Sequence, residues 1–164
     1  MNRLSETYQV RKLTAEDISA VFTLCSSNPL FYRYCPPAVT KENIAADMQA
    51  LPPNTTEEDK YYLGYFEKNH LIAVLDLILG YPEEDTAYIG FFMVDANLQK
   101  KGLGSEIIGE LCNGLSAMHM NRLKLAWAKG NPQAEHFWKK NGFRETGTES
   151  DMGEYIAVQA QREL

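Results

Sequence analysis

The period at which hydrophobic residues recur changes along the chain, and these changes predict where strands and helices lie. Residues 8–13 alternate with a period of two, which indicates a β-strand. Thr14 and Asp17 then stand three residues apart, as the two members of a helix capping box do. The apolar positions that follow recur every three to four residues, which predicts a helix with one buried face. A second such helix is predicted to begin at Thr40 and to end before Pro52.

The rest of the chain is predicted to consist of strands interrupted by two helices. Residues 61–81 predict a hairpin of two strands that turns at Lys68 and Asn69, and residues 86–94 predict a third strand. The elements expected after it are an amphipathic helix, a strand, a helix and two closing strands, over residues 107–118, 122–127, 131–140, 142–150 and 154–161. This order of elements predicts an α+β fold around a mixed sheet.

Composition and charge restrict the classes of function. The chain has 164 residues, and its 45% hydrophobic and 23% charged residues are typical of one soluble globular domain. We expect a cytoplasmic protein with no membrane partner, because no apolar stretch could cross a bilayer and the amino terminus lacks the apolar core of a signal peptide. The net charge of -6 argues against a nucleic-acid partner and is compatible with a cationic substrate. The three cysteines lack metal or redox spacing, so we expect reduced thiols and no metal.

A turn with two glycines separates the strand predicted at 86–94 from the helix that follows it. Gly102 and Gly104 carry no side chains that would keep a ligand away from the backbone, and a helix that begins there presents unpaired N–H groups and the positive end of its dipole. Such a turn is an anion site, most often a phosphate site. A Walker loop would need a longer spacing and a lysine after the second glycine, and a dinucleotide fingerprint would need Gly or Ala where Ile107 stands.

Two motifs in the sequence resemble those of the GNAT (general N-acetyltransferase) superfamily. Residues 99–104, QKKGLG, match the superfamily's pyrophosphate loop, Gln/Arg-x-x-Gly-x-Gly/Ala, at every defined position. Residues 131–143, NPQAEHFWKKNGF, are similar to its later helix, which ends in an aromatic residue, three further residues and Gly-Phe. The resemblance is good over residues 61–145 and rests on element order alone before them. It implies a single acetyltransferase domain over residues 1–164, with a mixed, mostly antiparallel central sheet that is flanked by helices and splayed between its central strands.

The resemblance implies that acetyl-CoA is the cosubstrate and that its acetyl group passes to an amine by direct attack in a ternary complex. The pantetheine arm is then expected to pair with the backbone of Met93 and Val94 like an added strand, and the Val94 N–H is the candidate donor to the thioester carbonyl. Asn131 matches an asparagine that bonds the cofactor in the family, and it can also cap the helix that it precedes. The residues expected to bind the pyrophosphate are Gln99, Lys100, Lys101, Gly102, Leu103, Gly104 and Ser105, although the two lysines could equally be solvated turn residues.

The sequence departs from the family at Trp138, where many members have the tyrosine that protonates the leaving thiolate. An indole N–H donates a hydrogen bond but is no usable acid near neutral pH. Either Trp138 packs against the cofactor sulfur and steadies it while solvent or another group supplies the proton, or the chain is a non-catalytic acyl-CoA-binding sensor or regulatory module. The first interpretation is favoured because a thiolate is a good leaving group, the pKa of a free thiol being about 8.5.

The resemblance implies a small-molecule or peptide amine as the acceptor, whose identity the sequence does not reveal, and a homodimer is compatible with the family. Asp76 interrupts an apolar strand, where alternation places it on the face of Ile72, Val74 and Ile78. Asp76 is a candidate to bind the ammonium or to act as a base through water, and it could equally be a hydrogen-bonded strand residue. Tyr32 and Tyr34, with Phe31, could close over the acceptor or simply pack a helix against the sheet.

Overall fold

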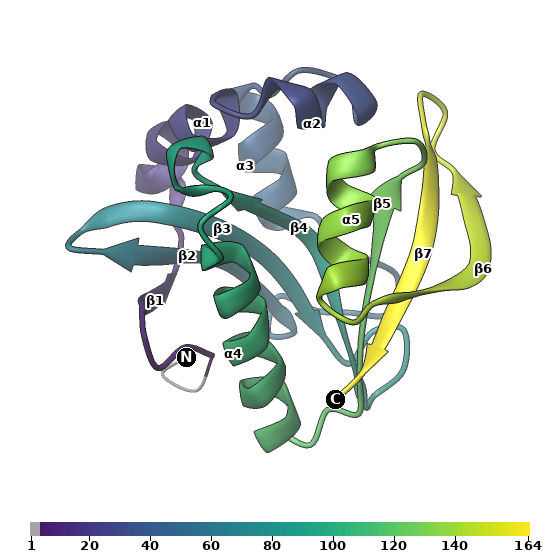
Figure 1. Ribbon diagram of the computed structural model, residues 1–164. Coiled ribbons are helices and arrows are strands. Elements are labelled where there is room, and N and C mark those ends of the chain that lie inside the picture. The colour runs from purple at the N-terminus through teal and green to yellow at the C-terminus, as the bar shows by residue number, and fades with distance from the viewer. Residues whose placement is uncertain (1–3) are drawn as a thin grey trace.

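A computed structural model describes residues 4–164, in which seven strands form one sheet in the order β1-β2-β3-β4-β5-β7-β6 (Figure 1). The strands are β1 (Gln9–Lys12), β2 (Lys60–Glu67), β3 (His70–Leu79), β4 (Thr86–Val94), β5 (Arg122–Ala128), β6 (Arg144–Asp151) and β7 (Ile156–Glu163). The α-helices are α1 (Ile18–Ser26), α2 (Pro29–Tyr34), α3 (Lys41–Gln49), α4 (Leu103–Ala117) and α5 (Pro132–Lys140). Short 3-10 turns, Ala15–Asp17 and Ala96–Leu98, precede α1 and follow β4.

The sheet is mixed, as the sequence predicts. Neighbouring strands run antiparallel everywhere except at β4 and β5, which are parallel. The hairpin of β2 and β3 turns through Lys68 and Asn69, both of which have positive φ angles. The prediction of an α+β fold with a mostly antiparallel sheet flanked by helices is therefore confirmed.

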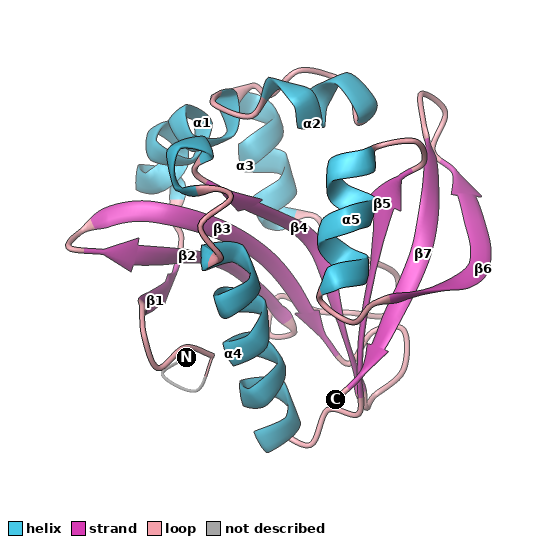
Figure 2. Ribbon diagram, in the orientation of Figure 1, coloured by secondary structure: helices cyan, strands magenta, loops and turns pink. Residues whose placement is uncertain are grey.

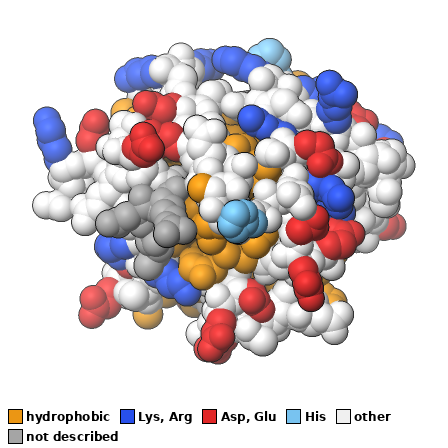
Figure 3. Space-filling view, turned by 90° about the horizontal axis from the view of Figure 1, so that it is seen from below, with side chains coloured by type: hydrophobic (Ala, Val, Ile, Leu, Met, Phe, Trp, Pro, Cys, Tyr) orange, Lys and Arg blue, Asp and Glu red, His pale blue; other side chains and the backbone are white. Residues whose placement is uncertain are grey.

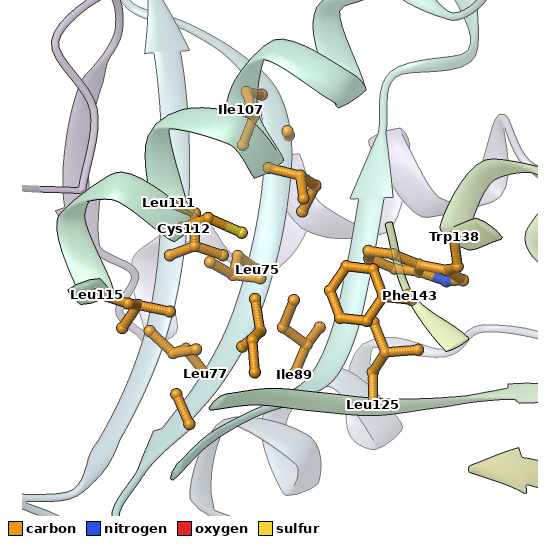
Figure 4. Packing of buried hydrophobic residues seen from close by; sticks show 14 of the residues in the cluster. Leu75, Leu77, Ile89, Ile107, Leu111, Cys112, Leu115, Leu125, Trp138 and Phe143 are labelled. Atoms are coloured by element: carbon orange, nitrogen blue, oxygen red, sulfur yellow. The ribbon is translucent and has the colours of Figure 1, made fainter. Parts of the chain in front are cut away.

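Helices cover both faces of the sheet, and each face has its own hydrophobic cluster (Figure 2). α4 and α5 pack on one face, where Leu111 and Leu115 of α4 lie beside Leu75 and Leu77 of β3, and Trp138 of α5 lies beside Phe143, all in the larger cluster (Figure 4). α1 and α3 pack on the other face through a smaller cluster that contains Val21, Leu24, Ile44, Val74 and Met93. Seen from below, acidic and basic side chains are interspersed around a small hydrophobic centre (Figure 3).

The first helical region differs from the sequence prediction in one respect. Three helices lie between β1 and β2, where the pattern predicts two, because the aromatic stretch after Asn28 forms the short helix α2. Pro29 at its first position favours a helix start, but six residues are too few to establish a helical period. Alternation along the strand also predicts that Ile72 and Val74 lie on the same face of the sheet. Instead, Ile72 belongs to the larger cluster and Val74 packs with the smaller one.

The two central strands separate toward their carboxyl ends, as Figure 1 shows. The pairing of β4 with β5 ends at Ile89 and Leu125, so residues 90–94 of β4 have no neighbouring strand on that side. A bulge at this point shifts the register of β4 against β3 between Asp76 and Leu77. Gly90 occupies the bulge, and an added Cβ there would lie 2.9 Å from Asp76 Oδ2, so only glycine fits without displacing the carboxylate.

None of the helices within residues 4–164 combines the length and the hydrophobicity that crossing a membrane requires.

Candidate active site

A cleft of about 510 Å³ opens where β4 and β5 separate. The carboxyl end of β4, the turn before α4 and α5 form most of its walls, and residues at the start of α2 complete them. We call it the central cleft. Its lining residues include Asn28, Phe31, Phe92, Met93, Val94, Gln99, Lys100, Gly102, Gly104, Ser105, Asn131, Gln133, His136, Phe137, Trp138 and Lys140.

The turn before α4 presents an anion site to this cleft. The first hydrogen bond of α4 runs from the Glu106 N–H to the Gly102 carbonyl, at 2.9 Å. The backbone N–H groups of residues 101–105 have no hydrogen-bond partner within the described chain. Unpaired N–H groups at the positive end of a 15-residue helix attract phosphate oxygens.

The two glycines of the turn have different structural roles. Gly102 has a φ of +87°, a left-handed conformation that favours glycine, and no other atom would crowd a side chain there. At Gly104, in contrast, a Cβ would lie 3.1 Å from Cε2 of Phe137. Gly104 therefore lets α4 and α5 approach each other, a packing role that the sequence motif does not reveal.

Basic residues lie at the mouth of the cleft. Lys100 and Lys140 line it together with His136, and all three are exposed. Lys101 is exposed on the same turn, although its side chain does not line the cleft. The positive charge of Lys100, Lys101 and Lys140 contrasts with the net charge of -6 of the whole chain.

Alternation along β4 decides which backbone groups face the cleft. The Asp95 N–H donates to the Ile72 carbonyl of β3 at 2.9 Å, so the N–H groups of Met93 and Phe91 also point toward β3. The N–H and carbonyl groups of Val94 and Phe92 point the opposite way, toward the gap between β4 and β5. The backbone of Met93 is thus occupied by β3, and the residue that alternates with Val94 on the open edge is Phe92, not Met93.

Asn131 caps α5 and keeps a free donor. Its Oδ1 accepts from the N–H groups of Gln133 and Ala134, both at 3.2 Å, which is the capping role that the sequence offered as one alternative. The residue is only 4% exposed, yet its side-chain amide nitrogen has no hydrogen-bond partner within residues 4–164 and is not sealed from solvent. A buried amide with a free N–H at the edge of a cleft is suited to bind a polar ligand.

Trp138 is held by aromatic packing at the base of the cleft. It is 8% exposed, and its ring centroid lies 4.9 Å from that of Phe137 and 5.2 Å from that of Phe143, in both cases edge to face. Phe92 of β4 lies 5.9 Å away. The indole N–H has no partner among the described residues and, like the amide of Asn131, retains contact with solvent. The ring is fixed by its neighbours while its one polar group stays available.

Asp76 forms a buried ion pair with Lys60 of β2. The Lys60 ammonium lies 2.9 Å from Oδ1 and 3.0 Å from Oδ2, and the two side chains are only 6% and 14% exposed. Burial raises the pKa of Asp76, and the ammonium opposes that rise. Both carboxylate oxygens are therefore engaged on the α1–α3 side of the sheet, which disfavours the role of a free base.

The aromatic residues expected around the acceptor lie on α2. Phe31 lines the central cleft, and its ring meets that of Phe91 edge to face at 5.6 Å. Tyr32 packs into the smaller cluster, where burial and the Cys25 thiol raise its pKa. Tyr34 is half-buried at the end of the helix. The roles predicted for Tyr32 and Tyr34 toward an acceptor remain predictions.

Several lining residues carry no signal in the sequence. Phe137 and Phe92 stack at 6.0 Å across the cleft wall, and the side chains of Asn28 and Gln133 reach Gln99. Asn28 stands before Pro29, the position of an ordinary helix cap, and nothing in the pattern connects it with β4. Within residues 4–164, no group of His, Cys, Asp and Glu side chains is arranged to hold a metal ion.

The fold and the cleft correspond to one protein family. The sequence model of the acetyltransferase (GNAT) family matches residues 26–143, well over half of the chain. The chain therefore belongs to this family of acetyltransferases, whose members use acetyl-CoA. A search among curated proteins found no significant sequence match.

Solved structures of acetyltransferases share the whole fold. An acetyltransferase from Thermus thermophilus is 24% identical, with 96% of this chain and 97% of that chain covered and a TM-score of 0.78. PaiA N-acetyltransferase from Thermoplasma acidophilum, in complex with coenzyme A, is 18% identical over 96% and 99%, with a TM-score of 0.70. Ribosomal-protein-alanine N-acetyltransferase from Brucella melitensis is 17% identical over 95% and 99%, with a TM-score of 0.68. At these identities the likeness establishes the fold.

Proposed function

We propose that this protein transfers the acetyl group of acetyl-CoA to an amine by direct attack in a ternary complex. One observation carries the proposal: the unpaired N–H groups of residues 101–105 and the open edge of β4 border the same cleft. The first is suited to a pyrophosphate and the second to an amide-containing arm. Coenzyme A has these two parts in sequence, and membership of the family makes it the expected ligand.

Each part of the cofactor has matching groups in the chain. The N–H groups of residues 101–105 would hold the pyrophosphate, with Lys100 and Lys140 as counter-charges at the mouth. On the open edge of β4, the Val94 N–H lies next to the pyrophosphate turn and would pair with the pantetheine arm, while Phe92, two residues farther from that turn, would meet the thioester end. This replaces the pairing through Met93 that the sequence alone suggests. The free amide N–H of Asn131 would donate to the same arm.

The Phe92 N–H is the proposed donor to the thioester carbonyl, in place of the Val94 N–H that the sequence suggests, because the pantetheine arm separates the thioester from the pyrophosphate turn. Acetyl-CoA supplies an activated acetyl group, and the attacking amine nitrogen forms a bond to its carbonyl carbon while the bond from that carbon to sulfur breaks. Negative charge develops on the carbonyl oxygen during the attack, so an N–H fixed at that oxygen stabilises the transition state more than the ground state. The end of β4 fixes such an N–H because β3 holds the strand from its other side.

Two protons must move in this reaction. The amine nitrogen loses one after it attacks, and the thiolate of coenzyme A gains one. We propose that water in the cleft accepts the proton that the amine loses, because Lys60 already binds both oxygens of Asp76. The Trp138 N–H is suited to donate a hydrogen bond to the leaving sulfur, while water supplies the proton that the indole cannot.

The first experiment is calorimetric titration with acetyl-CoA, combined with a measurement of free thiol release across a panel of amines. The panel contains polyamines, amino acids, aminoglycosides and peptides with a free amino-terminal alanine. Tight binding with amine-dependent thiol release is the expected result, and it would identify the acceptor class. Binding without release on any amine would favour the non-catalytic sensor instead, and failure to bind would remove coenzyme A from the central cleft.

A further inference from the structure

A hydrogen bond joins the end of α5 to the first turn of α4, beside the anion site. Asn141, the residue directly after α5, donates from Nδ2 to Ser105 Oγ at 3.2 Å and to the Phe137 carbonyl at 2.8 Å. Ser105 is the third residue of α4 and lines the central cleft, whereas Asn141 is not among its lining residues. The two side chains lie 36 positions apart in the sequence, so only the packing of α4 against α5 brings them together.

The direction of this hydrogen bond is fixed by the second partner of Asn141. The Phe137 carbonyl can only accept, so the amide atom that faces it must be the nitrogen. If the amide were turned over, its oxygen would lie against that carbonyl and two acceptors would meet. The nitrogen therefore also faces Ser105, whose hydroxyl oxygen accepts.

The hydroxyl hydrogen of Ser105 is consequently directed elsewhere. A serine hydroxyl has one donor hydrogen, which cannot point at a group that is itself donating to the same oxygen. Ser105 Oγ donates to no acceptor within residues 4–164, not even to the Lys101 carbonyl one turn earlier, which a helical serine often uses. Side chains of a helix lean toward its amino terminus, so this hydroxyl lies on the side of the unpaired N–H groups of residues 101–105. Its O–H is available to a ligand of the turn.

The carboxamide of Asn141 is held in place from two other elements. Arg162 of β7 donates from a terminal nitrogen to the Asn141 backbone carbonyl at 2.8 Å. At the same interface, Gly104 lets α4 approach the Phe137 ring closely. Asn141 is therefore fixed against Ser105 by contacts with both α5 and β7.

We infer that Asn141 is a positioning residue, which holds the Ser105 hydroxyl so that its O–H points at the pyrophosphate of coenzyme A. This inference rests on the proposed function, in which the turn before α4 binds the pyrophosphate. An O–H that donates to a phosphate oxygen makes a charge-assisted hydrogen bond, which is stronger than a neutral one. Because Asn141 already donates to the hydroxyl oxygen, the O–H reaches the ligand without first giving up another partner.

A double-mutant cycle on the affinity for coenzyme A, measured by calorimetric titration, tests this inference. Ser105→Ala removes the hydroxyl and should raise Kd ~10-fold, because one hydrogen bond to a charged group is lost. Asn141→Asp keeps the size of the side chain but can only accept, so the Ser105 hydroxyl should turn toward the carboxylate and Kd should rise by ~10-fold or more. In the double variant, the second substitution should add at most ~3-fold, since no hydroxyl remains to be turned.

Two further variants separate positioning from charge and from folding. Asn113→Asp is the matched control, because it adds the same charge at an exposed position farther along α4. It should bind coenzyme A as the unaltered protein does. Asn141→Ala frees the Ser105 hydroxyl without attracting it and should raise Kd only ~3-fold. A purely structural role of Asn141 would instead weaken binding equally with and without the hydroxyl.

The ³¹P resonances of bound coenzyme A locate the effect on the ligand. The two phosphorus atoms of the pyrophosphate should change their chemical shifts in Ser105→Ala and in Asn141→Asp, because each variant withdraws the same O–H from a phosphate oxygen. The 3′-phosphate of the same molecule is the internal reference, and its resonance should not move.

The outcomes distinguish this inference from the function on which it rests. If the unaltered protein does not bind coenzyme A, the proposed function itself is wrong. If it binds and Ser105→Ala changes neither Kd nor the pyrophosphate resonances, the hydroxyl does not contact the ligand and the inference is overturned. If Ser105→Ala weakens binding but Asn141→Asp acts equally in the presence and absence of the hydroxyl, Asn141 supports only the fold, and the inference is overturned as well.

Discussion

At the scale of single residues, Trp138 determines how this chain can treat the leaving sulfur. Phe92, Phe137 and Phe143 surround the indole and fix its plane, and aromatic pairs of this kind stabilise a fold by about 0.5–1.5 kcal/mol each. The N–H that remains free can donate a hydrogen bond to a thiolate without giving up its proton. The residue is thus suited to stabilise a leaving group that needs little acid assistance.

Replacement of Trp138 tests whether that N–H contributes. Trp138→Phe should lower kcat ~10-fold, because it removes one hydrogen bond to a charged group in the transition state. Trp138→Tyr restores a donor and should recover most of the loss. Steady-state rates with the best amine of the panel provide the measurement. Equal rates in the two variants would show that the indole acts through packing alone.

The ion pair between Lys60 and Asp76 makes a separate prediction about stability. Asp76→Asn leaves the buried ammonium without a counter-charge, which should lower the free energy of unfolding by about 3 kcal/mol. The double variant Lys60→Met/Asp76→Leu removes both charges and should recover most of this loss, as urea unfolding would measure. If the double variant folds and binds acetyl-CoA but has lost turnover, Asp76 serves the acceptor after all, and the sequence interpretation stands.

Single residues also show where sequence reasoning stops. Gln99, Gly102 and Asn131 can be found because their motifs are local: the backbone of a turn and a helix start determine their geometry. Asn28 cannot, because its contacts with Val94 and Gln99 span 66 and 71 residues. Lys60 is likewise not recognisable as the partner of Asp76, since the pairing depends on the register of β2 against β3.

At the scale of elements, the segments with a long, regular period were predictable and the short ones were not. β4 occupies the predicted residues 86–94, and α5 lies within the predicted 131–140. The six residues of α2 form a helix because Pro29 starts it and the sheet packs against its aromatic side chains, neither of which produces a period. The start of the first helical region was predictable, because Thr14 and Asp17 form the expected capping box.

Asp17, at the start of this first helical region, makes the stability of the fold depend on pH. Its carboxylate accepts from both terminal nitrogens of Arg11, at 2.7 and 2.8 Å, and from the Thr14 N–H at 2.8 Å. The hydrogen bonds from Arg11 lower the pKa of Asp17 to about 2, although burial opposes this. Because the folded pKa lies below the ordinary value, the contribution is fully present above about pH 4 and is lost as the pH falls toward 2.

Thermal unfolding of Asp17→Asn as a function of pH measures this contribution. At pH 7 the variant should melt about 3 °C lower, as expected for the loss of a helix cap in a domain of this size. The difference in melting temperature between the variant and the unaltered protein should narrow between pH 4 and pH 2, as the carboxylate of Asp17 becomes protonated. Glu16→Gln is the control, because Glu16 is an exposed neighbour in the same turn. A difference that stays constant down to pH 2 would contradict the proposed role of the charge.

At the scale of the whole molecule, the distribution of charge matters more than its sum. The chain carries a net charge of -6, yet Lys100 and Lys140 stand at the mouth of the central cleft. The other lysines near α5 are neutralised by partners: Lys139 pairs with Glu135 and Glu145, and Lys129 pairs with Glu149. A polyanionic ligand is therefore repelled by the protein at long range and attracted at the cleft, within about one Debye length.

Salt dependence of acetyl-CoA binding tests this arrangement. The double variant Lys100→Ala/Lys140→Ala should weaken binding ~10-fold at low ionic strength, because it removes both local counter-charges. The deficit should shrink at high salt, where the Debye length falls to about 3 Å at 1 M and the lysines of the unaltered protein are screened as well. The control is Lys129→Ala, which removes a positive charge outside the cleft and should change the affinity by less than about twofold. A deficit of equal size at low and high salt would mean that the two lysines act by contact packing, not by charge.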